Sequence, residues 1–277
     1  MEPAPEKPLE PSDVDGPRRG EPDSAAAATE AQEAPQSFVR KAFGWLLEGV
    51  LILVGAIVIA TLLRTFVGQM FVIPSGSMQN TLQINDRVLV AKFGGFQRGD
   101  VVVFEDPGAW LAPAPPSENP LKIFLEFVGV LPNSGTEHLI KRVIGMPGDH
   151  VRLNENGKLE VNGQELDETA YLYGEGGVQV APATVPFDIV VPKGHIFVLG
   201  DHRNASNDSR CRLADVSRTP GMSAFVPVDK VVGAAVAIVA PLERGSTFNL
   251  PETFKTVPAP AEPAPAQPDL IHVEPGC

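Results

Sequence analysis

The sequence has little cysteine and no cluster of metal ligands, and each shortage excludes a class of protein. Its 277 residues include two cysteines, Cys211 and Cys277. That number is too small for the disulfide framework of a small secreted domain, and the spacing does not suit a zinc site. We expect two free thiols without a function. The five histidines are scattered and suggest neither a metal site nor a catalytic triad, so the sequence predicts no metal and no cofactor.

Blocks of basic residues are also missing. No stretch interleaves Lys and Arg with aromatic residues, as nucleic-acid-binding surfaces often do, so we expect no nucleic-acid partner. The net charge is −12, of which residues 1–37 carry −6 and residues 251–277 carry −3. The acidity therefore lies in the terminal segments, and the middle of the chain is nearly balanced.

Both terminal segments lack apolar periodicity. Residues 1–37 are rich in Ala, Pro, Glu and Asp, and residues 251–277 are rich in Pro and Ala. Chains of such composition cannot bury enough apolar surface to offset the entropy lost on ordering. The sequence therefore predicts an acidic, disordered N-terminal tail and a disordered Pro/Ala-rich C-terminal tail.

One long apolar run stands at residues 44–63 (GWLLEGVLILVGAIVIATLL), and it contains one charged residue, Glu48. Twenty residues of helix span about 30 Å, one hydrocarbon thickness, and Trp45 stands where an interfacial aromatic residue belongs. A cleavable secretory signal would have a shorter preceding region and a small-x-small site after the run. A buried core helix would not be flanked by charges on both sides. The run predicts a single transmembrane helix.

The charges around this run favour one orientation. Arg40 and Lys41 precede it, and Arg64 follows it. Because cytoplasmic flanks carry the excess of Lys and Arg, we expect a cytoplasmic N-terminus and an extracytoplasmic domain from residue 67 onward.

Residues 67–250 consist mainly of short β-branched runs separated by Gly, Pro, Asn and Asp turns. This pattern is typical of an all-β protein, so we predict a mainly β domain of coiled antiparallel sheet with a barrel-like form. The exception is the apolar segment 119–133, which suits either a short helix or an apolar loop. The runs lie at residues 85–93, 98–107, 138–153, 158–166, 187–201 and 231–240.

Four local motifs lie in or beside these runs, at residues 71–82, 85–104, 138–151 and 194–213. The first contains Ser75 and Ser77 around a glycine. The third places Lys141 in an apolar strand, where alternation groups it with Leu139 and Val143 and turns Arg142 to the opposite face. Desolvation there lowers the pKa of a lysine, and a neutral amine can accept the proton of a serine hydroxyl. The alternative is a lysine that extends from an edge strand into solvent.

The motifs PSGSM, IKRVIGMPGD and GDHRNASNDSR, in this order behind an N-terminal apolar run, resemble those of bacterial type I signal peptidases. The resemblance covers about residues 45–239. It implies a membrane-bound serine endopeptidase of the plasma membrane that removes signal peptides from exported pre-proteins by cutting after Ala-x-Ala. It also implies a Ser–Lys dyad in place of a Ser–His–Asp triad. We expect a monomer whose partners are pre-proteins and the lipid bilayer.

Within this resemblance, Ser77 corresponds to the nucleophile and Lys141 to the general base. The Ser75 hydroxyl and the Ser77 backbone N–H are implied to form the oxyanion hole, and Ser206 to orient the lysine amine. The remaining correspondences are supporting ion-pair residues, Asp201, Asp208, Arg142 and Arg210, and residues lining shallow apolar substrate pockets, Phe71, Ile73, Pro74 and Ile140.

Two positions depart from the family pattern. Asn80 stands where proline usually precedes Thr-Leu, which we expect to change the rigidity of the turn and not the chemistry. Cys211 replaces a commonly aromatic residue.

Three other functions compete with this interpretation. A self-cleaving repressor with a Ser–Lys pair would need a DNA-binding module and no membrane span. A catalytically inactive, membrane-anchored scaffold for secreted proteins would have lost Ser77 or Lys141, and both are present. A peptidase dedicated to one precursor is compatible with the same sequence.

Overall fold

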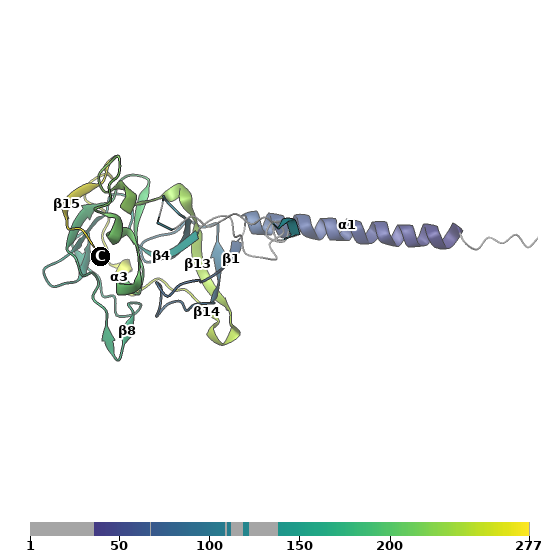
Figure 1. The fold of residues 1–277 in the computed structure, drawn as a ribbon, viewed down its shortest axis with the longest axis horizontal. Helices are drawn as coiled ribbons and strands as arrows, with labels where there is room; N and C mark the ends of the chain where they lie inside the picture. Colours follow the sequence, from purple (N-terminus) through teal and green to yellow (C-terminus); the bar gives the residue numbers. More distant parts are fainter. Residues whose placement is uncertain (1–35, 67, 109, 112–118, 122–137, 277) are drawn as a thin grey trace, which may run out of the picture. The chain divides into compact units, whose positions relative to one another are not determined.

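The computed structural model describes the chain except residues 1–35, 67, 109, 112–118, 122–137 and 277 (Figure 1). The expected disorder of the N-terminal tail therefore lies outside the described residues, as does most of the apolar segment 119–133. The chain forms two compact units, residues 1–50 and 51–277.

The predicted transmembrane helix is part of α1 (Gln36–Phe66), a continuous helix of 31 residues. Within it, residues Arg40–Leu62 are long and apolar enough to cross a membrane, and none of the apolar window is buried by protein. Large side chains such as Trp45 and Leu51 are mostly exposed. Because contiguous exposed apolar surface is rare on soluble proteins, the helix is a candidate membrane span.

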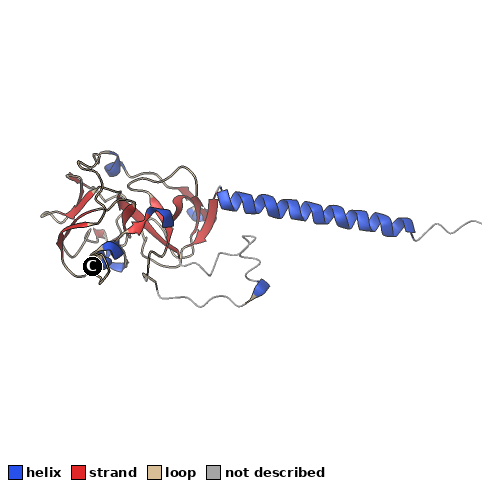
Figure 2. Cartoon of the chain, turned by 90° about the horizontal axis from the view of Figure 1, so that it is seen from above, coloured by secondary structure: helices blue, strands red, loops and turns tan. Residues whose placement is uncertain are grey.

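The rest of the described chain is mainly β, as predicted, and its helices are short (Figure 2). The larger sheet has eight strands, and all its pairings are antiparallel. Its strands, in spatial order, are β1 (Gly68–Val72), β2 (Arg87–Ala91), β13 (Val231–Ala240), β3 (Val101–Glu105), β4 (His138–Gly145), β11 (His195–Leu199) and β12 (Val226–Pro227), with β14 (Ser246–Thr247) paired to β13.

A second antiparallel sheet has the order β15 (Asp269–Val273), β10 (Phe187–Val190), β5 (His150–Leu153), β6 (Leu159–Val161) and β7 (Gln164–Glu165). A small hairpin pairs β8 (Gly174–Glu175) with β9 (Val178–Gln179). The short helices are α3 (Glu252–Lys255), η1 (Arg203–Ala205), η2 (Ser209–Arg212), η3 (Met222–Ala224), η4 (Val228–Lys230) and η5 (Leu242–Arg244).

Strand β3 of the large sheet is buried on both faces, which is why it is apolar almost throughout. In β3, Val101 and Val103 pack into one cluster with Ile140, whereas Val102 and Phe104 pack into another. This is the two-residue alternation of a strand between two cores. A third cluster combines residues of the second sheet, such as Ile189, with Phe197 of the large sheet and Phe254 of the C-terminal segment.

The C-terminal tail is ordered, so the prediction of disorder for residues 251–277 is wrong over its described part. Phe254 and Val257 are buried in the third core cluster, and β15 pairs with β10. Composition misled the prediction because a few spaced apolar residues suffice when a folded domain already offers a surface for them. Backbone groups are also paired: the Lys193 N–H donates to the Pro265 carbonyl at 2.7 Å.

The expectation of a free thiol is wrong for Cys211, which is disulfide-bonded, and the same expectation for Cys277 lies outside the described residues. The cysteine count correctly excluded a framework of several disulfides, but it could not exclude a single bridge between distant residues. Cys211 belongs to η2, in the last of the four local motifs.

Candidate active site

The turn after β1 carries Ser77 into the protein interior. Met78 and Leu82, on the C-terminal side of the serine, are fully buried in the core, and the Leu82 N–H donates to the Met78 carbonyl at 2.7 Å. The core thus anchors the turn directly after the serine. Ser77 itself is 7% exposed, so its hydroxyl lies in a largely dry environment.

Lys141 reaches this hydroxyl from β4. Its Nζ atom lies 2.7 Å from Ser77 Oγ and 3.0 Å from the Ile140 carbonyl oxygen. Burial lowers the pKa of Lys141 to about 8, although Asp208 and Asp201 act in the opposite direction. Near pH 8 a substantial fraction of the amine is therefore neutral and able to accept a proton.

The loop from Gly200 to Arg210 closes the site behind this pair. The His202 N–H donates to the Ser77 carbonyl at 3.0 Å. A Cβ atom at Gly200 would lie 2.5 Å from that carbonyl oxygen and 2.2 Å from Ser206 Oγ. Glycine is required at this position because any side chain would push the loop away from Ser77.

Asp208 and Arg210 form an ion pair within the loop. The Asp208 carboxylate accepts hydrogen bonds from Arg210 Nε and Nη2, each at 2.9 Å, and from the Gly200 N–H at 3.0 Å. Burial alone would raise the pKa of Asp208, but Arg210 and these hydrogen bonds outweigh it and lower the pKa. The carboxylate stays charged and ties the two ends of the loop together.

Ser206 differs from its expected role. Its Oγ atom is buried and has no hydrogen-bond partner among the described residues, so the implied hydrogen bond to the lysine amine is not formed. Ser206 lies close enough to Asp208 to contribute to the lowering of that carboxyl's pKa, but the geometry falls short of a hydrogen bond.

Arg142 and Asp201 form a second buried ion pair. Arg142 donates to the Asp201 carboxylate through Nε at 2.8 Å and Nη2 at 2.6 Å, and to the Gly99 carbonyl through Nη1 at 2.6 Å. The Thr81 hydroxyl donates to the same carboxylate. Arg142 therefore connects β4, which carries the lysine, to the loop and to the turn that carries the serine.

The other predicted site residues lie around the serine with different exposure. The Ser75 Oγ atom is 3.4 Å from Ser77 Oγ, and Ser75 and Pro74 are exposed. Ile73 and Ile140 are buried in one core cluster, against which the half-buried Phe71 packs. The predicted substrate-pocket residues thus lie near one another, with Ile73 deepest.

Asn80 shows why proline is absent from this turn. Its φ angle is +84°, in the left-handed region that asparagine tolerates and that the ring of proline cannot reach. The Asn80 side chain also donates to the Leu172 carbonyl at 3.3 Å. A proline at this position would need a different φ angle and therefore a different course of the turn.

Sequence reasoning missed two residues of the site that lie outside the four motifs, Glu168 and Tyr171. Both are buried, and Arg142 lies over the ring of Tyr171, with Cζ 4.2 Å from the centroid. They belong to a stretch without a motif. The sequence around Glu168 combines acidic, small and aromatic residues and has no pattern that distinguishes it from an exposed surface loop.

Among the residues that the structure describes, no group of three or more His, Cys, Asp or Glu side chains could hold a metal ion. What the described groups can do is nucleophilic catalysis: a buried hydroxyl, an adjacent amine with a lowered pKa, and charged residues that fix both.

Comparison with known proteins points to one family. Residues 46–240 match the family described as "Signal peptidase, peptidase S26". A signal peptidase I of Leptolyngbya laminosa is 33% identical over 224 residues, covering 79% of this chain and 92% of the relative. One from Mycobacterium tuberculosis is 32% identical over 242 residues, covering 80% of each chain.

Among solved structures, a signal peptidase I of Enterococcus faecalis is similar to 51% of this chain and 97% of its own, at 23% identity and a TM-score of 0.31. The sequence matches span most of the chain and include the turn with Ser77 and the strand with Lys141. The chain belongs to the signal peptidase family, peptidase S26, and is a serine endopeptidase.

Proposed function

We propose that this protein is a membrane-anchored signal peptidase that removes signal peptides from exported pre-proteins with a Ser77–Lys141 dyad. One observation carries the proposal: the amine and the hydroxyl lie 2.7 Å apart in a buried site. The names of the relatives, which are signal peptidases I, support the substrate class. An inactive scaffold would have no need of a buried lysine with a lowered pKa.

In the proposed mechanism, neutral Lys141 takes the proton of the Ser77 hydroxyl as Oγ attacks the scissile carbonyl carbon. The resulting oxyanion accepts hydrogen bonds from the Ser75 hydroxyl and the Ser77 backbone N–H; such donors contribute about 10²–10³ in rate each. The lysine ammonium then protonates the leaving amine as the C–N bond breaks. Water, deprotonated by Lys141, hydrolyses the acyl ester and regenerates Ser77.

The substrate would bind as an added strand between β1 and β4. Strand β1 is at the edge of the sheet and pairs with β2. The stretch Leu139–Lys141 pairs with β3 on one side, and the pairing with β11 begins only at Arg142. The rings of Phe71 on β1 and His138 on β4 lie 5.0 Å apart between centroids, so an extended peptide can bridge the two strands.

This arrangement supports cleavage after Ala-x-Ala. A side chain directed from the added strand toward Ile73 and Ile140 meets a nearly closed apolar surface, since these residues are 1% and 7% exposed. Only a small residue fits above such a surface. Residues two apart on a strand point to the same face, which accounts for two small residues separated by one of any kind.

The apolar helix α1 would anchor the peptidase as a single-pass monomer with its N-terminus in the cytoplasm. Confinement of enzyme and substrate to one membrane raises their effective concentration. The charges flanking the span support this orientation.

The test is cleavage of a pre-protein with an Ala-x-Ala site in liposomes, comparing wild type, Ser77→Ala and Lys141→Ala. We expect both variants to be folded and inactive, and the product of the wild type to begin one residue after the second alanine. Ser246→Ala, on the exposed strand β14, is the matched serine control and should cleave like wild type. A folded Lys141→Ala variant with full activity would remove the lysine from the mechanism.

A further inference from the structure

A segment without any catalytic motif, residues 167–173, packs behind the proposed dyad. The Tyr173 N–H donates to the Asp201 carbonyl at 2.9 Å, and the Leu172 carbonyl accepts from Asn80. The segment therefore contacts both the loop that closes the site and the turn that carries the nucleophile. Its buried acid, Glu168, and its buried phenol, Tyr171, have no counterpart in the mechanism described above.

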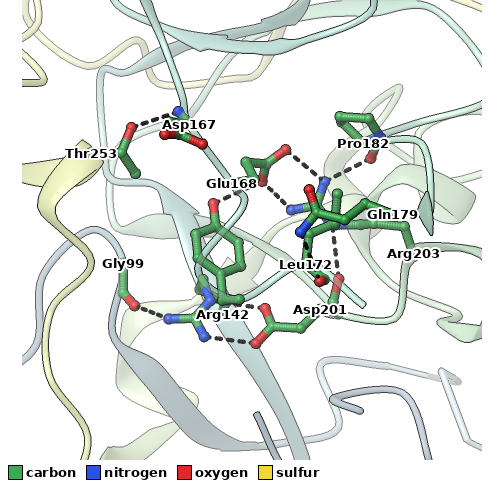
Figure 3. A network of polar contacts seen from close by, with 12 residues as sticks. Gly99, Arg142, Asp167, Glu168, Leu172, Gln179, Pro182, Asp201, Arg203 and Thr253 are labelled. Atoms are coloured by element: carbon green, nitrogen blue, oxygen red, sulfur yellow. Dashed lines mark hydrogen bonds and ion pairs between the residues drawn. The ribbon is translucent and has the colours of Figure 1, made fainter. Parts of the chain in front are cut away.

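Glu168 is the counter-charge of Arg203. The Arg203 guanidinium donates to Glu168 Oε1 and, at 3.3 Å, to Oε2; both side chains are almost fully buried, with exposures of 1% and 4%. Figure 3 shows Arg203 between Glu168 and Pro182, whose carbonyl accepts from Nη1 at 2.7 Å. Arg203 Nε also donates to the Gly200 carbonyl at 2.8 Å, so Glu168 fixes the residue that holds the start of the loop.

Tyr171 connects the same carboxylate to Arg142. Its hydroxyl donates to Glu168 Oε1 at 2.8 Å, and the Arg142 guanidinium lies over its ring. Figure 3 shows the hydrogen bonds from the edge of the Arg142 guanidinium to Gly99 and Asp201. The ring of Tyr171 contacts the flat face of the guanidinium, which these hydrogen bonds leave uncovered.

The buried charges of the site balance only when Glu168 is counted. Three arginines and three carboxylates are at least nine-tenths buried here, and their charges sum to zero. Lys141 in its neutral form leaves this sum unchanged. Without Glu168, the buried guanidinium of Arg203 would be left without its counter-charge. The residues are Arg142, Arg203 and Arg210, with Asp201, Asp208 and Glu168.

We propose that Glu168 is a positioning residue for the dyad, acting through Arg203 on the loop and through Tyr171 on Arg142. The inference rests on the proposed function, since it concerns how the same two residues are held and charged. It assigns Glu168 two separable effects: a geometric one on the rate and an electrostatic one on the protonation of Lys141.

The electrostatic effect has a definite sign. Removing a negative charge disfavours the lysine ammonium and lowers the pKa of Lys141. The acid limb of the pH profile of kcat/KM, which reports the free enzyme's base, must then move to lower pH. The charges that act directly on Lys141 are Asp208 and Asp201. The other charged and titratable groups of the surrounding network are His202, Arg203 and Arg210 from the loop, Arg142 from the same strand, and Asp100, Tyr171 and Glu168, which interact with Arg142 or Arg203.

The experiment measures kcat and kcat/KM against pH for the full chain in liposomes, with an Ala-x-Ala pre-protein as substrate. Glu168→Gln keeps the shape and removes the charge; Tyr171→Phe keeps the ring and the charge and removes the hydroxyl. Glu165→Gln is the matched control, because Glu165 is three residues away, 40% exposed, and paired with a surface lysine.

We expect Glu168→Gln to lower kcat by roughly 10- to 100-fold, as small misplacements of catalytic groups do, and to move the acid limb to lower pH. Tyr171→Phe should lower kcat without moving the limb, and Glu165→Gln should match wild type. A merely structural Glu168 would reduce the yield of folded protein and leave the limb in place.

Folded Glu168→Gln with the wild-type rate and profile would overturn the inference. If that variant does not fold, Tyr171→Phe decides, and a wild-type kcat in it is the negative result. Failure of the proposed function looks different: wild type itself would not cleave, or Ser77→Ala would remain active.

Discussion

Lys141 and Ser77 are 64 positions apart in the chain, yet the amine of one lies 2.7 Å from the hydroxyl of the other. The two groups are in direct contact, without a histidine between them, and both are buried. The lysine is on a central strand, β4, whose pairing with β3 places Lys141 opposite Val102. The serine is on a turn anchored by Met78 and Leu82. Rigid elements thus support both partners, as a preorganised site requires.

Activity should rise with pH through the alkaline range. Since the pKa of Lys141 is lowered to about 8 and only the neutral amine accepts a proton, kcat/KM should fall about tenfold per pH unit below this value and level off above it. A pH profile between about 6 and 10 with an Ala-x-Ala substrate measures this directly. A profile governed by a group near pH 6.5, the ordinary pKa of histidine, would point to a histidine in place of the lysine.

Replacing the lysine should stabilise the fold while it abolishes cleavage. The folded-state pKa of about 8 is below the ordinary lysine value of 10.5, so protonation favours the unfolded state below pH 10.5, and wild-type stability rises with pH between these values. At about 1.36 kcal/mol per pKa unit, the cost near neutral pH is on the order of 3 kcal/mol. Lys141→Met should recover part of it.

Chemical unfolding in detergent near neutral pH and again at about pH 10.5 is the measurement, with the exposed Lys158→Met as control. We expect a higher midpoint for Lys141→Met near neutral pH and a smaller difference at the alkaline pH, where the unfolded lysine also loses its proton. Equal or lower stability near neutral pH would show that desolvation of the buried amine does not destabilise the fold.

Breaking the ion pair between Arg142 and Asp201 should destabilise the protein. Asp201→Asn leaves a buried guanidinium without its counter-charge, and such losses cost about 3–5 kcal/mol. Asp215→Asn is a useful comparison, because Asp215 pairs with Arg212 at 3.2 Å but is 41% exposed, where pairs contribute about 0–1 kcal/mol. The measurement is the urea concentration at the midpoint of unfolding. If this midpoint is the same for both variants, the buried pair does not have the assigned role.

The C-terminal segment should be needed for a stable domain. Phe254 is 4% exposed and its ring stacks with that of Tyr171 at 5.9 Å between centroids, so Phe254→Ala should cost about 3–5 kcal/mol. Ile271→Ala, at a position 57% exposed on β15, should cost much less. If both variants unfold at the same temperature as wild type, the segment does not contribute to the core.

Thiol titration tests the cysteines. Cys211 is disulfide-bonded. Its thiol should be unreactive in unreduced protein, and reduction should release it without changing the oligomeric state. A covalent dimer on a non-reducing gel would indicate a bridge between chains instead.

The sequence by itself determined the class of fold and the identity of the proposed dyad. The apolar run at residues 44–63 has few stable environments besides a membrane, and β-branched runs between turns specify strands because both signals are local. Ser77 and Lys141 are predicted because each lies in a motif that resembles those of a known family, and because desolvation lowers the pKa of a lysine in an apolar strand.

Only the tertiary structure decided what supports the dyad. Glu168 became part of the site because a buried arginine requires a counter-charge, and no local pattern tells which acid supplies it. The C-terminal segment folded against expectation because Phe254 and β15 use a surface that exists only after the rest of the domain has formed. Composition describes what a segment can bury alone, whereas order depends on what the remaining chain presents to it.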